Sequence, residues 1–388
     1  MTYMTEWLPF HIPDLDEEEI DSVVSVLRSG WLTTGSKVKQ FELEFAAITG
    51  VRHAIAVNSC TAALHLALDA IGVREGDEVI VPTMTFAATA EVVSYFKAKP
   101  VLVDCVEGTL NIDPKRIERA ITSRTKAIIP VHFGGHPCEM DEILDIARSN
   151  NLRVIEDAAH AIPARYRGKR IGTIADCTCF SFYATKNMTT GEGGMVTTNN
   201  DEWAARIRAM SLHGLSRDAW SRYTEKGSWA YEILAPGFKY NLTDIAAALG
   251  IPQLHKCERF WKIRERYAAL YNDGFRDLPE IIRPRAADHV QHAWHLYVIQ
   301  LDLGRLRVGR NEFIELLRER DIASSVHFIP LHLHPYYRDM DGYRPDDFPV
   351  ASSAFLRILS LPLYSKMTES DIQRVVTVIR EVVRMNRR

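Results

Sequence analysis

The sequence from residue 54 to residue 198 alternates short runs of β-forming residues with stretches of helical spacing. Seven runs predict strands, at 54–57, 78–81, 101–104, 127–131, 153–156, 178–183 and 195–198. Amphipathic stretches lie between the earlier runs, at 62–71, 87–96 and 140–149. Such alternation predicts an α/β fold with a mostly parallel sheet covered by helices on both faces. Ligands of these sheets bind at the carboxyl ends of the strands, so functional side chains are expected directly after the runs.

Helical patterns flank this region on both sides. Residues 16–28 carry apolar side chains at helical spacing, and Gly30 ends the pattern. Residues 244–273 predict one long helix, interrupted near Pro252, and a smaller α+β segment follows it. We therefore predict two domains. Residues 1–250 hold an N-terminal segment and a large α/β domain, and residues 251–388 hold the connecting helix and a small α+β domain.

The composition excludes several classes of function. The chain has 388 residues, with 47 Lys and Arg against 50 Asp and Glu, and it has no block of like charge. Neither a nucleic acid nor an anionic membrane is therefore expected as a partner. The first residues lack the basic and apolar regions of a signal peptide, and no apolar run approaches the length of a membrane span. The six scattered cysteines form no C-x-x-C pair, so we predict a cytoplasmic protein with free thiols.

Lys186 is the first candidate for chemistry. It follows the predicted buried strand at 178–183 and precedes the glycine-rich residues 191–194, which allow a ligand to approach the backbone closely. A buried amine cannot remain an unpaired cation, and a neutral amine is a nucleophile toward aldehydes. Pyridoxal phosphate is the cofactor that uses such a lysine. A single lysine after a strand is more often structural, so Lys186 alone does not decide the function.

Further candidates follow the other predicted strands. Residues 58–64 offer hydroxyl groups at the start of a helix, as a phosphate requires, although Ser and Thr are also ordinary helix caps. Asp157 ends a strand and can pair with a protonated pyridine nitrogen, and His160 follows three residues later. Phe86 can stack on a pyridine ring, although an aromatic residue there is otherwise simply core. The dinucleotide and P-loop fingerprints are absent, so the joint pattern favours pyridoxal phosphate.

Several motifs resemble those of the DegT class of fold-type-I pyridoxal-phosphate aminotransferases, which act on nucleotide-linked keto sugars. The resemblance covers essentially the whole chain. The motifs lie at residues 29–35, 58–64, 76–82, 155–161, 181–194, 213–214 and 237–244. The resemblance implies a large domain with a mostly parallel seven-stranded sheet, a smaller α+β domain, and a homodimer with shared active sites.

The resemblance also implies roles for individual residues. Lys186 would be the Schiff-base lysine and the acid/base, Asp157 would pair with the pyridinium, His160 would lie beside the ring, and Phe86 would stack on it. The residues implied in holding the cofactor phosphate are Thr61, Ala62, Ser181 and, from the other subunit, Asn241. The residues implied in contacting the substrate are Trp31, Thr33 and His327. Cationic groups that could meet a substrate diphosphate are Arg217, Arg222, Lys226 and Lys239. No metal is expected, because histidines 327, 332 and 334 lack a usual zinc spacing.

Within the class, two hints compete. Residues 239–244 and 292–296 are similar to the UDP-4-amino-4-deoxy-L-arabinose–oxoglutarate aminotransferase, whereas residues 326–332 and 335–337 resemble enzymes that aminate UDP-4-keto-6-deoxy-N-acetylhexosamines. Both imply that glutamate, released as 2-oxoglutarate, gives its amino group to the 4-keto group of a UDP-linked sugar. The product would serve cell-surface polysaccharide, lipid A or glycan synthesis. The sequence leaves open a dTDP-keto-sugar 3-aminotransferase and a non-catalytic pyridoxal-phosphate-binding regulator.

Overall fold

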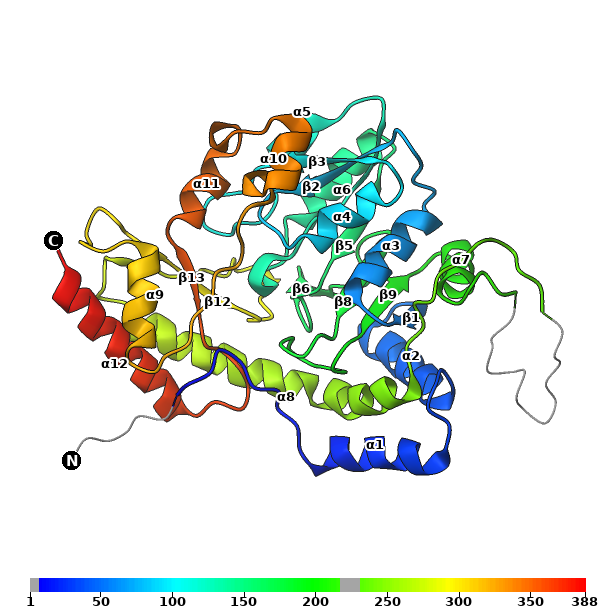
Figure 1. Cartoon of the computed structure of the whole chain (residues 1–388), viewed down its shortest axis with the longest axis horizontal. Helices are drawn as coiled ribbons and strands as arrows, with labels where there is room; N and C mark the ends of the chain where they lie inside the picture. The colour runs from blue at the N-terminus through cyan, green and yellow to red at the C-terminus, as the bar shows by residue number, and fades with distance from the viewer. Residues whose placement is uncertain (1–6, 217–230) are drawn as a thin grey trace.

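A seven-stranded sheet is the largest element of the computed structural model, which describes residues 7–216 and 231–388 (Figure 1). The strand order is β1 (His53–Val57), β9 (Gly194–Thr198), β8 (Cys177–Ser181), β5 (Arg153–Asp157), β4 (Thr125–Ile128), β2 (Glu78–Pro82) and β3 (Lys99–Val103). Strand β9 runs antiparallel to both of its neighbours, and the other neighbouring pairs are parallel. The predicted mostly parallel sheet is confirmed, and each of the seven predicted runs overlaps one of its strands.

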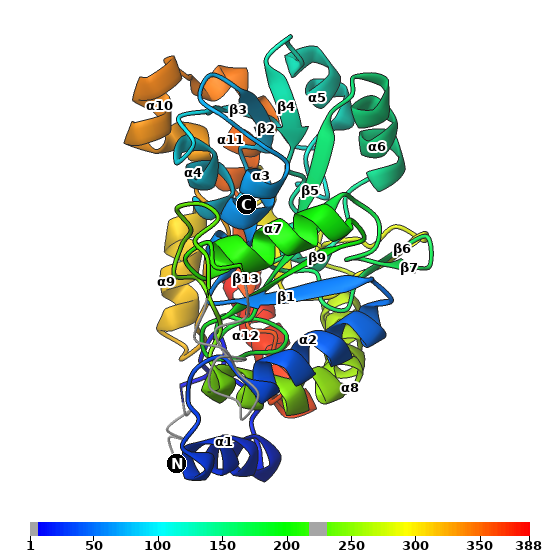
Figure 2. The same cartoon turned by 90° about the vertical axis from the view of Figure 1, so that its right-hand side faces the viewer.

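Helices cover both faces of this sheet. They are α2 (Ser36–Thr49), α3 (Cys60–Ala70), α4 (Ala88–Ser94), α5 (Pro114–Ala120), α6 (Met140–Ser149) and α7 (Asp201–Ser211). Because side chains alternate along a strand, Ile55 and Val57 of β1 pack into the core formed with α3, α4 and α7. Ala54 and Ala56 pack into the opposite core, with α2 and α6. Figure 2 shows α7 and α2 on opposite sides of β1.

Helix α8 (Asp244–Gly274) connects the large sheet to the small domain (Figure 1). It continues through Pro252, so the predicted interruption near this residue is wrong. The physical reason is packing. Gly250 lies so close to Phe41 and Thr190 that an added Cβ would clash with both, and the surrounding residues of α8 are buried. This burial outweighs the backbone hydrogen bond that proline removes. The expected domain boundary after residue 250 falls inside α8.

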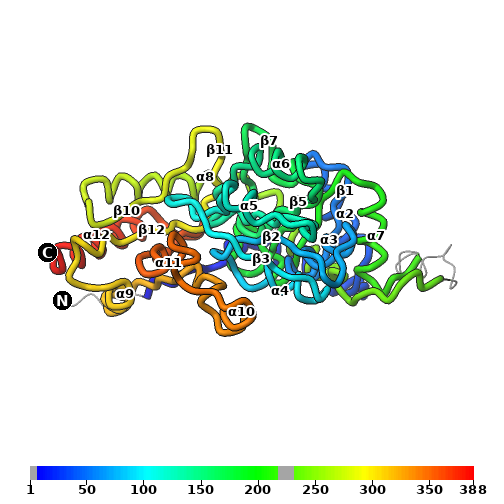
Figure 3. Tube along the Cα trace, turned by 90° about the horizontal axis from the view of Figure 1, so that it is seen from above, coloured from blue at the N-terminus to red at the C-terminus, as the bar shows by residue number. Residues whose placement is uncertain are grey.

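The small domain contains an antiparallel sheet and four helices. The sheet order is β10 (Ile281–Ile282), β12 (Tyr297–Leu301) and β13 (Ile358–Leu361). The helices are α9 (Arg310–Arg318), α10 (Pro335–Asp341), α11 (Pro349–Phe355) and α12 (Glu369–Asn386). Figure 3 shows α9 and α12 at one end of the molecule and α2 and α7 at the other.

Short elements complete the chain. A third sheet has the order β11 (Val290–Gln291), β6 (Arg165–Tyr166) and β7 (Lys169–Arg170). Single 3-10 turns occupy Phe133–Gly135, Leu331–Leu333 and Pro345–Asp347. Helix α1 (Glu17–Ser29) packs on α8, and before it Leu8 forms a β-bridge with Ile322 of the small domain. Across residues 7–216 and 231–388, no helix combines the length and apolar character that a membrane span requires.

Candidate active site

A cavity of about 370 Å3 opens where strands β5 and β8 end. Seven of the residues selected from the sequence line it: Thr61, Phe86, Asp157, His160, Ser181, Lys186 and His327. The parallel strands explain this convergence, because their carboxyl ends meet at one edge of the sheet. We refer to this space as the Lys186 cavity.

Lys186 lies in a turn after β8, where its backbone N–H donates to the Tyr183 carbonyl at 2.9 Å. The next residue is fixed as well, since the Asn187 amide donates to the carbonyl oxygens of Ile162 and Ala293. Burial lowers the pKa of Lys186 to about 8, while the nearby Cys60 and Asp157 oppose that shift. The amine is therefore neutral in a larger fraction of molecules at neutral pH than an exposed lysine, which suits attack on an aldehyde.

Asp157 is held at the end of β5 by two hydrogen bonds. Its Oδ2 accepts from the Thr89 hydroxyl at 2.8 Å, and its Oδ1 accepts from the Ala159 backbone N–H at 3.1 Å. The Thr89 oxygen in turn lies 2.8 Å from the Thr85 hydroxyl, so the three residues form a buried chain. Burial raises the pKa of Asp157, and its two hydrogen bonds act in the opposite direction. The carboxylate is thus oriented into the Lys186 cavity with a fixed geometry.

His160 lines the same cavity as a neutral ring. Its Nδ1 accepts from the Gly134 backbone N–H at 3.3 Å, so the proton of the neutral ring is on Nε2, which remains available as a donor. Burial, with smaller contributions from Lys186 and His327, lowers the pKa of His160 well below its usual range. The His295 ring lies 4.4 Å from it, centroid to centroid.

The first turn of α3 forms part of the cavity wall. Thr61 and Ser181 line the cavity there. Ala62 does not line the cavity: its side chain is buried in the core, and its N–H donates to the Ser59 hydroxyl that caps the helix. Gly194 is required beside this turn, since a Cβ at that position would lie 2.5 Å from the Ser59 carbonyl carbon. A helix N-terminus such as this one offers backbone N–H groups to an anion.

The N-terminal segment contributes residues that the sequence did not reveal. Phe10 and His11 line the Lys186 cavity, and the Phe10 ring stacks on His327 with centroids 5.6 Å apart. His327 is also held by its Nδ1, which lies 2.8 Å from the Ser360 hydroxyl. Burial lowers the pKa of His327 to about 4 and that of His11 to about 3, so both rings are neutral at physiological pH.

Three candidates lie outside the Lys186 cavity of their own chain. The Trp31 indole donates to the Thr34 carbonyl, and the Asn241 amide donates to the Thr34 hydroxyl at 2.7 Å. The Thr33 carbonyl accepts from the Asp244 backbone N–H. These residues therefore form one hydrogen-bonded junction. Of the four cationic candidates, Lys239 is exposed, and Arg217, Arg222 and Lys226 lie outside the described residues.

The residues present fit pyridoxal phosphate. Lys186 supplies an amine for the aldehyde, Asp157 a carboxylate for the ring nitrogen, and the start of α3 a place for the phosphate. Phe86 is 63% exposed, so its ring face is open for stacking on a pyridine. The individual contacts to the cofactor remain predictions.

Comparison with known proteins gives three informative matches. A sequence model of the DegT/DnrJ/EryC1/StrS aminotransferase family matches residues 13–380. An uncharacterized protein of Methanocaldococcus jannaschii, MJ1066, is 54% identical over 98% of this chain and 99% of its own length. The spore coat polysaccharide biosynthesis protein SpsC of Bacillus subtilis is 51% identical over 97% of both chains.

Solved structures agree with these matches. The putative sugar aminotransferase Spr1654 of Streptococcus pneumoniae, in its PLP form, superposes with a TM-score of 0.91 at 34% identity, over 98% of this chain and 99% of that one. Its PMP form gives the same TM-score.

Proposed function

Because the chain belongs to the DegT/DnrJ/EryC1/StrS aminotransferase family, we propose that it transfers the amino group of glutamate to the 4-keto group of a UDP-linked sugar. The chain is a pyridoxal-phosphate-dependent sugar aminotransferase. The donor, the sugar position and the nucleotide are the proposed part. The observation that carries the proposal is that Lys186 and Asp157 line one cavity with a neutral His160 beside them.

The protein groups divide the work of such a reaction. When bound, pyridoxal phosphate supplies an electron sink for the carbanion that forms at the substrate carbon. The Asp157 carboxylate sustains that sink by pairing with a protonated ring nitrogen. Lys186 Nζ removes the proton from Cα of glutamate and, in the second half of the cycle, returns a proton to C4 of the sugar. The first half ends with release of 2-oxoglutarate before the keto sugar reacts, so ping-pong kinetics are expected.

The choice of a UDP-linked 4-keto sugar is supported by the motifs at residues 239–244 and 326–332, which resemble enzymes acting on UDP sugars. The relative SpsC bears a name from spore coat polysaccharide synthesis, which supports a product destined for cell-surface polysaccharide. All six cysteines are free, which supports a reducing compartment, and we place the reaction in the cytoplasm.

We also propose a homodimer with shared sites. The junction of Trp31, Thr33 and Asn241 does not line the Lys186 cavity of its own chain, and a second copy would bring it to that cavity. Mixing inactive Lys186→Ala and Asn241→Ala subunits tests this arrangement. Hybrid dimers would hold one site free of both substitutions, so partial activity should return. Mixtures that stay inactive despite subunit exchange would contradict shared sites.

The direct test of the reaction is incubation of the holoenzyme with glutamate and a panel of UDP-, GDP- and dTDP-4-keto sugars, with a dTDP-3-keto sugar included. Products are identified by mass, and Lys186→Ala is the matched control. We expect a 4-amino product from a UDP sugar. Amination of the dTDP-3-keto sugar alone would contradict the proposed substrate. If glutamate leaves the visible absorbance unchanged, a non-catalytic regulator is the better account.

A further inference from the structure

A second and larger cavity, of about 980 Å3, lies between the two domains. One wall comes from the large domain, at residues 107–110 and 133–136, and the other from the small domain, at residues 272–300. It shares a single lining residue, Leu296, with the Lys186 cavity, so the two spaces lie on opposite sides of one segment. We refer to this space as the interdomain cavity. Its volume is within the range of small-molecule sites.

Cationic groups dominate the charge of the interdomain cavity. Arg276, Arg283 and Arg285 line it, and Glu107 is the one carboxylate among its lining residues, all of which belong to the described chain. One N–H of Arg283 donates to the Asn272 carbonyl, and Arg276 lies 3.5 Å from Asp273 in an exposed ion pair. A guanidinium has five N–H groups, so each arginine retains donors for a ligand.

Two buried side chains add neutral donors to the same lining. The His292 Nδ1 accepts from the Trp294 backbone N–H at 2.8 Å, which places the proton of the neutral ring on Nε2. Within the described residues, Nε2 has no hydrogen-bond partner, and neither does the side-chain amide of Gln300. His292 is 7% exposed and Gln300 is 8% exposed. Both residues line the cavity, and their free polar atoms are not among the fully buried unpaired ones of the described chain, so a ligand or water in the cavity can reach them.

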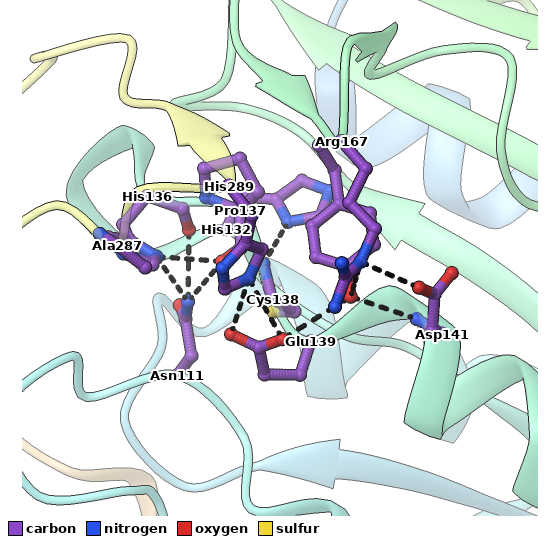
Figure 4. A network of polar contacts seen from close by, with 11 residues as sticks. Asn111, His132, His136, Pro137, Cys138, Glu139, Asp141, Arg167, Ala287 and His289 are labelled. Carbon is purple, nitrogen blue, oxygen red and sulfur yellow. Dashed lines mark hydrogen bonds and ion pairs between the residues drawn. The ribbon is translucent and has the colours of Figure 1, made fainter.

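The large-domain wall is rigid. Figure 4 shows His136 between Asn111 and the segment at Ala287, and the Ala287 backbone N–H donates to His136 Nε2 at 3.4 Å. The Asn111 amide donates to the carbonyl oxygens of His136 and Pro137 at 3.0 Å. The Asn111 bonds fix the large-domain wall, and the Ala287 bond links it to the small domain at the edge of the cavity. A ligand would therefore meet a preformed site, which lowers the entropic cost of binding.

We propose that the interdomain cavity binds the diphosphate group of a nucleoside diphosphate, at a site separate from the Lys186 cavity. Three guanidinium groups, an imidazole N–H and an amide match the several acceptor oxygens of a diphosphate, and guanidinium pairs with phosphate in a bidentate geometry. The volume leaves room for the nucleoside beside Trp294.

Calorimetric titration of the holoenzyme with UDP tests the proposal. The double variant Arg276→Gln, Arg285→Gln removes two exposed charges and leaves the Arg283 contact to Asn272 in place. We expect a UDP-binding event in the wild type that is weakened about tenfold or more in this variant, since charge-assisted phosphate contacts are lost. Inorganic pyrophosphate should compete for the same event.

The matched control is Arg148→Gln, Arg318→Gln, which removes two exposed arginines that also form ion pairs with a residue three positions away. It should bind UDP as the wild type does. The proposal is overturned if no UDP binding is sensitive to Arg276 and Arg285, if the control variant weakens binding equally, or if pyrophosphate fails to compete. Binding at the Lys186 cavity persists in the double variant, so failure of this proposal is distinguishable from failure of the proposed reaction.

Discussion

The hydrogen bond from Thr89 to Asp157 offers a sharp test of how the protein controls its cofactor. Replacing Thr89 with Val keeps the shape of a fully buried side chain and removes the hydroxyl that donates to Asp157 Oδ2 at 2.8 Å. The carboxylate then loses one of its two donors, while the Ala159 N–H remains. Burial already raises the pKa of Asp157, and the substitution should raise it further.

The size of the effect follows from the bond that is lost. A hydrogen bond to a charged group contributes about 1.5–3 kcal/mol, which corresponds to an increase of about 1–2 pKa units for Asp157. Asp157 must be ionised to pair with the ring nitrogen. The acidic limb of the pH profile of kcat/KM should therefore move to higher pH by about the same amount.

The assay is the single-turnover reaction with glutamate, followed by absorbance from pH 5 to 9. Thr85→Val is the comparison, because Thr85 reaches Asp157 only through the Thr89 hydroxyl and should shift the limb less. Thermal unfolding checks that both variants fold. If Thr89→Val folds and leaves the acidic limb unmoved, the account of Asp157 is refuted.

Three further predictions concern the same cavity. Asp157→Asn should fold normally by circular dichroism yet lose most of its activity, since the amide carries no charge for the ring nitrogen; wild-type turnover would contradict the role. Lys186→Met should stabilise the cofactor-free protein at pH 7 by on the order of 3 kcal/mol, because the lysine pKa of about 8 is below its usual 10.5. This gain should shrink as the pH rises from 8 to 10.5, where the unfolded wild type binds more protons than the folded one, and a pH-independent gain would contradict the burial of the amine. Gly194→Ala should weaken the affinity for pyridoxal phosphate, measured by fluorescence titration, because the new Cβ meets the Ser59 carbonyl.

The large sheet could be predicted from the sequence because its signal is local. Each strand is a short apolar run between helical patterns, and the observed bounds differ from the predicted ones by a few residues. The interruption expected at Pro252 is wrong for the opposite reason. Proline is a local signal, but the close packing of α8 at Gly250 against Phe41 and Thr190 involves residues far away in the sequence.

In the site, too, local patterns predict some residues, and others are placed by contacts between distant parts of the sequence. Asp157 and Lys186 follow predicted strands, so the topology of a parallel sheet brings them together. Phe10 and His11 reach the cavity from an extended segment with no periodicity, which is placed by the pairing of Leu8 with Ile322. No sequence pattern in the N-terminal residues predicts that Phe10 and His11 line the Lys186 cavity. The interdomain cavity could not be predicted from the sequence either, because its arginines lie near residues 107–110 only in the folded chain.

The most direct measurement of the central claim is reduction of the purified holoenzyme with borohydride, followed by digestion and mass spectrometry. The account predicts a pyridoxyl group on the peptide that contains Lys186, and none on that peptide in Lys186→Ala. A pyridoxyl group on another lysine, or none on any peptide of a protein shown to hold the cofactor, would contradict it.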